Sequence, residues 1–268
     1  MPELPDLEII TGFLRWSIPG VEIKQVEIKE PLVLRCSAKD LIQDLKGRAF
    51  TKVTRRGKFL IFDLAPGEHL VFNLMLSGRL QYCRPGEKSR SYLCLQLGFS
   101  NGHQLRYYDR KRMGRIYRVQ KGDFSSIPQF ELLGPEATDP AVDPEVFQKR
   151  IRRHPGMIKN ILTNQRFLAG IGNAYADEIL FAAGILPFRR RPSLTSEELA
   201  NLHRALGEVL AWAEKELKGR VGADIHVEVR DFLRIHGKGG QVCPVCGGTI
   251  SEVTANRRRT NFCRGCQK

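Results

Sequence analysis

The hydrophobic positions of the first 130 residues occur in short runs that are typical of β-strands. An opening helix comes first, with Leu7, Ile10 and Leu14 on one face. Alternating or apolar runs follow at 21–28, 59–64, 70–76, 92–97, 104–108 and 115–119. The alternation of the first run changes phase at Gln25, which predicts a β-bulge, and Ser100-Asn101-Gly102 predicts a hairpin turn. Many short strands at regular spacing favour a sandwich or barrel-like β domain.

A helical pattern replaces this alternation near residue 140, after a linker that contains Pro140 and Pro144. A helix is predicted from Asn173 to Ala183, with Gly184 at its left-handed stop. The Thr195-x-x-Glu198 pattern predicts a capping box. The long helix behind it has an apolar face made of Leu199, Leu202, Leu206, Val209, Ala213 and Leu217. Two domains are therefore expected, a β domain followed by a helical one.

Charge indicates the kind of partner. The chain has 268 residues with 43 basic and 29 acidic side chains, a formal net charge of +14. Such an excess favours a polyanion, with nucleic acid ahead of an anionic membrane surface or an acidic protein. No run of 18 apolar residues and no secretory signal pattern occurs, so no membrane span is expected. The expected location is the cytoplasm of a bacterial-type cell, in association with the nucleoid.

Four of the seven cysteines have the spacing of a metal site. Cys243, Cys246, Cys263 and Cys266 form C-x2-C-x16-C-x2-C. Four thiolates at this spacing suit one tetrahedral, structural zinc ion, and two disulfides are the less favoured alternative in a chain without an export signal. The scattered Cys36, Cys83 and Cys94 are expected to be packed thiols.

Residues 254–260, between the two cysteine pairs, are predicted to be a turn between two short strands. The segment contains Arg257, Arg258 and Arg259, and residues 218–268 carry 10 basic and 4 acidic side chains. A zinc-held hairpin with arginines at its tip suits contact with phosphates, although a solvated basic loop has the same composition.

The first three residues suggest covalent chemistry. If Met1 is removed, Pro2 is a secondary amine that can add to a sugar C1′ and form a cationic iminium, while Glu3 moves protons to the ring oxygen. With Met1 retained, the same nitrogen is a tertiary amide without a usable lone pair. The alternative is that Pro2 to Pro5 only begin a helix.

Three further segments combine basic side chains with tight turns. Lys58 follows Arg55-Arg56-Gly57 just before an apolar strand, where a lysine could hold a phosphate or transfer a proton. The loop 108–114 mixes cations with Met113, which suits a probe that enters a groove. Gly170-Ile171-Gly172 precedes a helix whose N-terminus could receive an anion, although a plain turn explains it equally well.

Several motifs together resemble the formamidopyrimidine-DNA glycosylase / endonuclease VIII family. They are MPELPDLE at the start, RRGK-F-L at 55–60, LSGRL at 76–80, SNG and YYDRKRMG within 100–114, LGPE at 133–136, NQRFLAGIGNAYADEILFAAGILP at 164–187, and the cysteine motif ending at Lys268. The resemblance spans essentially the whole chain, and the stretch 164–187 and the cysteine motif are its most specific parts.

The resemblance implies an α+β chain with four parts. These are an N-terminal β-sandwich domain (1–132), a linker (133–144), a helix–two-turn–helix domain (145–220), and a loop with a C-terminal zinc finger (221–268). It implies a monomeric base-excision repair enzyme, a DNA glycosylase and AP lyase, whose partner is damaged DNA. Two rivals are a non-catalytic zinc protein that binds lesions or junctions, and a glycosylase that acts on bulky, alkylated or crosslinked bases.

The resemblance also assigns residue roles. Pro2 would attack C1′ and leave a covalent imine, Glu3 would assist ring opening, Lys58 would act in the same pocket, and Arg258 would contact phosphates during β,δ-elimination. The expected DNA contacts are Leu76, Arg110, Lys111, Met113, Arg153, Lys159 and Asn173.

Some positions depart from the family pattern. Asp6 replaces a common glutamate, Arg110 replaces a proline, and the void-filling set is Leu76, Lys111 and Met113 instead of Met, Arg and Phe. Because lysine lacks the flat bidentate fork of arginine, strict selection for cytosine opposite the lesion is not expected. The segment 222–236 is also shorter than the loop that caps 8-oxoguanine in purine-specific members. Oxidised pyrimidines or ring-opened purines are therefore the expected substrates.

Overall fold

The computed structural model describes residues 1–255 and 258–268 and divides into two compact units. The first unit comprises Met1–Glu131 and Leu217–Val229, and the second comprises Leu132–Glu216 and Arg230–Lys268. The segment 217–229 packs with the first unit, although the predicted ranges 145–220 and 221–268 assigned it to the C-terminal half of the chain. The predicted domain ranges stay a prediction. The α+β class is confirmed.

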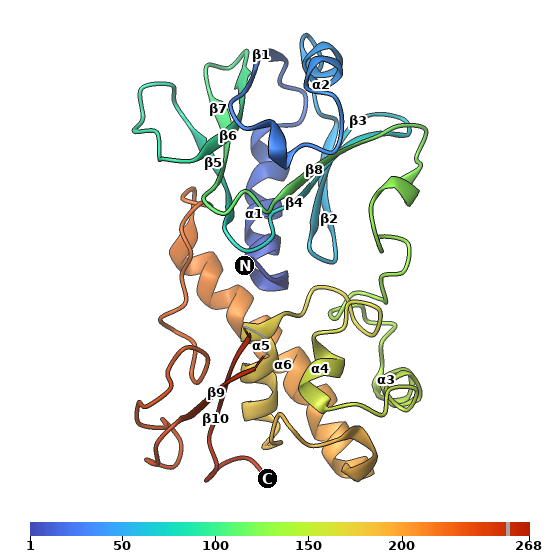
Figure 1. The fold of residues 1–268 in the computed structure, drawn as a ribbon, viewed down its shortest axis with the longest axis vertical. Helices are drawn as coiled ribbons and strands as arrows, with labels where there is room; N and C mark the ends of the chain where they lie inside the picture. The colour runs from blue at the N-terminus through green and yellow to red at the C-terminus, as the bar shows by residue number, and fades with distance from the viewer. Residues whose placement is uncertain (256–257) are drawn as a thin grey trace. The chain divides into compact units, whose positions relative to one another are not determined.

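Two four-stranded antiparallel sheets form the first unit. One has the order β1-β6-β7-β5 and the other the order β2-β3-β4-β8. Their strands are β1 (Ile23–Ile28), β2 (Lys52–Arg56), β3 (Phe59–Ala65), β4 (Glu68–Asn73), β5 (Gly78–Cys83), β6 (Leu93–Phe99), β7 (Gln104–Asp109) and β8 (Arg115–Val119). The helices of this unit are α1 (Leu4–Ser17) and α2 (Ala38–Leu45), with short 3-10 turns η1 (Pro31–Val33) and η2 (Phe124–Ser126). In Figure 1, α1 lies between the two sheets.

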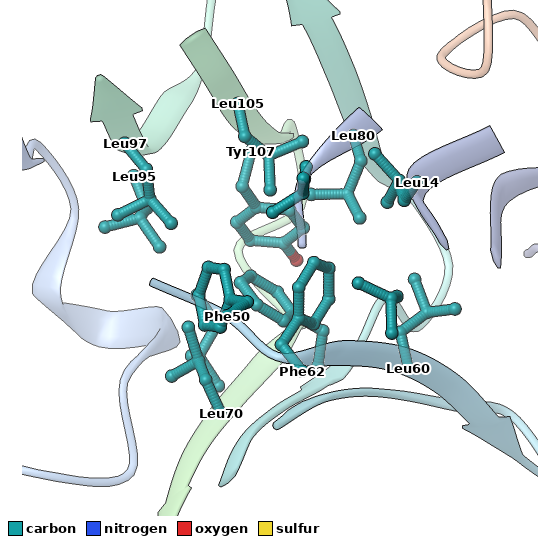
Figure 2. Close-up of a cluster of buried hydrophobic side chains, with 14 of the residues drawn as sticks. Leu14, Phe50, Leu60, Phe62, Leu70, Leu80, Leu95, Leu97, Leu105 and Tyr107 are labelled. Atoms are coloured by element: carbon teal, nitrogen blue, oxygen red, sulfur yellow. The ribbon is translucent and has the colours of Figure 1, made fainter. Parts of the chain in front are cut away.

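The core of the first unit joins the facing sheets. Figure 2 shows Phe62 and Leu70 from one sheet opposite Leu97 and Tyr107 from the other, with Leu14 of α1 beside them. The rings of Phe72 and Tyr107 meet across the sheets at 5.8 Å between centroids. The apolar face predicted for α1 is thus buried, because Leu7, Ile10 and Leu14 all belong to this core.

The strand pattern is confirmed in most places. The bulge in β1 lies between Ile23 and Gln25, and the turn at 100–102 joins β6 to β7, with Gly102 at φ +79°. The run 70–76 was wrong at its end, because β4 stops at Asn73 and a turn follows. The strands β2 and β5 and the helix α2 were not predicted from the sequence, because polar residues interrupt their apolar patterns.

Helices and a short hairpin form the second unit. They are α3 (Pro144–Ile151), α4 (Ile158–Leu162), α5 (Asn173–Ala182), α6 (Ser196–Val221, whose last turn belongs to the first unit), a 3-10 turn η3 (Arg191–Ser193), β9 (Ser251–Ala255) and β10 (Arg258–Phe262). The capping box is confirmed, because the Glu198 N–H donates to Thr195 Oγ1 at 3.1 Å and the Thr195 N–H donates to Glu198 Oε2 at 2.8 Å. Gly184 ends α5 at φ +71°, as predicted.

Candidate active site and nucleic-acid interface

Pro2 and Glu3 are buried at the start of α1. Glu3 is the N-cap of the helix, and its N–H donates to the Asp6 carboxylate at 2.8 Å, so that the two residues form a capping box. Asp6, a departure from the family pattern, therefore fixes the backbone next to Pro2. The structure carries Met1, whose amine lies 3.7 Å from the Glu228 carboxylate.

Pro2 also lines a hollow of the first unit. The hollow is small, about 20 Å³, is continuous with solvent, and is bordered by Asp6, Arg79 and Glu228 together with apolar side chains of α1 and the segment 217–227. Arg79 and Glu228 form an ion pair at 2.5 Å. Pro2 is thus a buried residue beside a small hollow with charged groups at its border.

Lys58 lies in a two-residue turn between β2 and β3. Gly57 precedes it at φ +57°, a left-handed conformation that glycine adopts readily. Arg55 anchors this turn to α1, because its buried guanidinium donates to Glu8 at 2.5 and 2.8 Å. The turn that carries Lys58 is therefore held against the helix that Pro2 and Glu3 begin.

The three predicted void-filling residues lie in two turns of the first unit. Leu76 lies between β4 and β5, and Lys111 and Met113 lie between β7 and β8, where both apolar side chains are 42% exposed. The exposed Arg110 lies in the second turn as well.

The fully buried Asp109 joins these two turns. It accepts hydrogen bonds from the Ser77 hydroxyl, from the Lys111 N–H at 3.2 Å and from the Gly114 N–H at 2.6 Å. Neither Ser77 nor Asp109 was predicted as a site residue from the sequence. A charged residue at the end of an apolar strand was the available signal for Asp109.

Replacing Asp109 by alanine is expected to destabilise the first unit by about 3 kcal/mol or more, because several buried donors lose their charged acceptor at once. Urea unfolding of Asp109→Ala against the parent measures this loss. Asp40→Ala, on the exposed side of α2, is the matched control. A loss no larger than that of the control would show that the carboxylate does not hold the turns.

Lys159 and Asn173 both bind the zinc hairpin of the second unit. The Lys159 ammonium, in a side chain only 8% exposed, lies 2.6 Å from the buried Asp177 carboxylate and donates to Thr260 Oγ1 at 2.8 Å. It also donates to the Arg259 carbonyl at 3.2 Å, and Asn173 Nδ2 donates to the same carbonyl at 2.7 Å. These contacts fix β10 against the start of α5. Contact of either residue with DNA stays a prediction.

The four cysteines of the motif lie together. Their sulfur atoms are all within 4.8 Å of one another, and the Cys243–Cys266 and Cys246–Cys263 pairs are 3.7 and 3.4 Å apart. A tetrahedron with Zn–S bonds of about 2.3 Å has sulfur atoms about 3.8 Å apart, so the residues fit zinc. Burial raises the pKa of the Cys243 thiol, but N–H groups of Cys246 and Val245 outweigh it and lower the pKa to about 7. Burial and the neighbouring cysteine side chains raise the pKa values of Cys263 and Cys266.

Arg258 and Arg153 are exposed in the second unit, at the start of β10 and just after α3. The turn predicted at 254–260 was wrong at both ends, because Thr254 and Ala255 pair with Arg259 and Arg258 as strand residues. Asn256 and Arg257, also predicted in this turn, lie outside the described residues. The roles predicted for these arginines stay predictions.

Comparison with known proteins covers nearly the whole chain. Residues 1–116 match the formamidopyrimidine-DNA glycosylase N-terminal domain, residues 133–222 match the H2TH domain of the same enzyme, and residues 240–268 match a zinc finger found in FPG and IleRS. A formamidopyrimidine-DNA glycosylase of Desulforamulus reducens is 35% identical over 100% of this chain and 99% of its own. The chain belongs to the formamidopyrimidine-DNA glycosylase family. This membership makes it a DNA glycosylase of base-excision repair with one structural zinc site.

Further similar proteins agree with this family. A formamidopyrimidine-DNA glycosylase of Thermus thermophilus is 37% identical over 100% of this chain and 98% of its own. The Lactococcus lactis Fpg solved with DNA containing an N7-benzyl-Fapy-dG is 28% identical, with a TM-score of 0.90 over 100% of both chains. The same protein solved with DNA containing an abasic site is 27% identical, with a TM-score of 0.90 over 99% of both. Among the described residues, no helix has the length and apolar composition to cross a membrane.

Proposed function

We propose that the chain excises oxidised pyrimidines or ring-opened purines from DNA with Pro2 as its nucleophile, and that it cleaves the strand as an AP lyase. The observation that carries this proposal is the placement of Pro2. It borders a hollow open to solvent, directly before Glu3, on the helix that also anchors the Lys58 turn. We also propose that the chain acts as a monomer in the cytoplasm, in association with the nucleoid.

The reaction requires removal of Met1, which makes Pro2 a secondary amine. Its lone pair forms the N–C1′ bond while the C1′–base bond breaks and the base leaves with a proton. Glu3 then protonates the ring oxygen as the C1′–O4′ bond opens, which gives an iminium ion. Loss of a C2′ proton expels the 3′ phosphate, and a second elimination expels the 5′ phosphate. Lys58 and Arg258 are proposed to hold the phosphates.

Borohydride trapping on duplex DNA with an abasic site tests this proposal. Reduction of the iminium makes a stable protein–DNA bond, so we expect a covalent adduct and, without borohydride, a gap of one nucleotide. A protein that binds the duplex but gives neither product would be the non-catalytic lesion-binding rival.

Replacing the exposed Arg258 by alanine is expected to weaken DNA binding and to reduce the slope of log affinity against log salt by about one unit. The reason is that each neutralised phosphate releases roughly 0.9 counterions. Binding titrations on abasic DNA at several salt concentrations measure the slope. Arg204→Ala, which removes an arginine paired with Glu208 on α6, is the control. An unchanged slope in Arg258→Ala would contradict the phosphate contact.

A further inference from the structure

A buried carboxylate, that of Asp177 in α5, joins three other segments of the second unit. The residue is 0% exposed, and its Oδ1 atom lies 2.6 Å from the ammonium of Lys159 in α4. Its Oδ2 atom accepts a hydrogen bond from the Asn261 N–H of β10 at 3.1 Å and lies 2.8 Å from Nδ1 of His236. Since an apolar residue at a buried position is often at least as stabilising as an ion pair, stability alone gives no reason for a carboxylate here.

The contacts of Asp177 and Lys159 meet three consecutive residues of β10, the strand that lies beside α5 in Figure 1. Lys159 donates to the Arg259 carbonyl at 3.2 Å and to Thr260 Oγ1 at 2.8 Å. Asp177 accepts from the N–H of the residue that follows Thr260. One carboxylate therefore orients the lysine that binds the strand and also binds the strand directly.

The zinc site is too distant to fix Arg258 by itself. Arg258 begins β10 and Cys263 follows its end, so five residues, about 17 Å of extended chain, separate the arginine from the nearest zinc ligand of its strand. A two-stranded hairpin without further support is only marginally stable in water. The contacts at 259–261 are therefore what positions the backbone of Arg258, whose own side chain is exposed.

A fixed phosphate contact matters most after the first of the two eliminations. Once the 3′ phosphate has left, the sugar stays bonded to Pro2 through the iminium and is joined to DNA only on its 5′ side. The second elimination removes the C4′ proton and breaks the C5′–O bond, whose electron pair leaves with the 5′ phosphate. Water that adds to C1′ first releases Pro2 as an amine and ends the reaction after one cut. A phosphate kept in place by Arg258 favours the second elimination over this hydrolysis.

We propose that Asp177 is a positioning residue for the second elimination, because its carboxylate keeps Arg258 on the 5′ phosphate through Lys159 and β10. The inference rests on the proposed function, in which Pro2 forms the iminium and Arg258 holds a phosphate. Asp177 acts through the strand and not on the reacting atoms.

The test is the ratio of one-nucleotide gap to single-cut product when abasic duplex DNA is cleaved in a single turnover. A loss of folded protein lowers the total cleavage but leaves this ratio unchanged, so the ratio separates positioning from stability. Asp177→Asn has nearly the shape of the parent side chain and can still accept from the Asn261 N–H, but it removes the charge beside Lys159. We expect the ratio to fall at least fivefold while borohydride trapping stays within twofold of the parent.

Glu178→Gln is the matched control, because Glu178 is the adjacent buried carboxylate of α5. It accepts from the N–H groups of Arg234, Ile235 and His236, and its hydrogen bonds within the described part of the chain do not reach β10. This variant should keep the parent ratio even where it lowers the stability of the second unit.

Thr260→Val is the second variant if Asp177→Asn does not fold. It removes the hydroxyl that Lys159 meets with little change of shape, and it should lower the ratio at least twofold. The parent ratio in the folded variants, or an equal fall in Glu178→Gln, would overturn the inference and leave the proposed function intact. A parent protein that leaves abasic DNA uncut would instead overturn the proposed function, and this inference with it.

Discussion

Any residue that remains attached before Pro2 is expected to lower base excision at least about 10³-fold and to abolish borohydride trapping. An acylated proline nitrogen is a tertiary amide whose lone pair is delocalised, so the N–C1′ bond does not form. Pro2→Gly is expected to trap much less DNA, because the glycine amine is free to rotate and is no longer held by the proline ring in position to attack C1′. Single-turnover excision and trapping, with the terminus verified by intact mass, measure both effects.

Pro19→Gly is the control for these terminal variants, since Pro19 lies beyond the end of α1. It should retain trapping. Efficient incision by material whose mass includes Met1 would contradict the role of the Pro2 amine, even if family membership stands.

Removal of zinc is expected to unfold the hairpin of β9 and β10 and to weaken binding to abasic DNA by a hundredfold or more. Binding of a structural zinc ion supplies about 10–16 kcal/mol in isolated fingers, and the small cluster of Phe181, Ile235 and Ile250 next to the cysteines cannot replace it. Without the hairpin, the Arg259 carbonyl no longer meets Lys159 and Asn173, and Arg258 loses its fixed position.

The test measures zinc content, hydrogen exchange across residues 240–268 and DNA affinity in the same samples. Exchange should rise and affinity should fall as zinc is removed. Cys246→Ser should reproduce it, whereas Cys36→Ser, which alters a thiol of the first unit outside the zinc site, should not. Normal DNA affinity in a zinc-free protein would defeat the structural role of the ion.

Local features of the site could be predicted from sequence because they depend on spacing along the chain. The cysteine pairs and the Thr195-Glu198 capping box involve residues within one turn or hairpin, where backbone geometry fixes which side chains meet. The end of β4 could not be predicted in this way. The run 70–76 is apolar except for Asn73, but Met75 adopts φ +50° and Leu76 is exposed in a turn.

Contacts between distant positions could not be predicted from the sequence. Ser77 and Asp109 are 32 residues apart, and Lys159 and Thr260 are 101 apart. The family resemblance placed Lys159 among the DNA contacts, and that role stays a prediction. The structure shows contacts that the resemblance did not predict, because the Lys159 ammonium meets a buried carboxylate and two acceptors on the zinc hairpin.

Short-range periodicity and spacing predicted the zinc ligands and most strands and helices, whereas the family and the role of the Pro2-Glu3 pair were predicted from the motif resemblance. Two features became visible only in the folded chain: Asp109 joins the turn of Leu76 to the turn of Lys111, and the segment 217–229 returns to the first unit. Those features arise where chain segments far apart in sequence pack together. Burial then decides which polar groups need a partner.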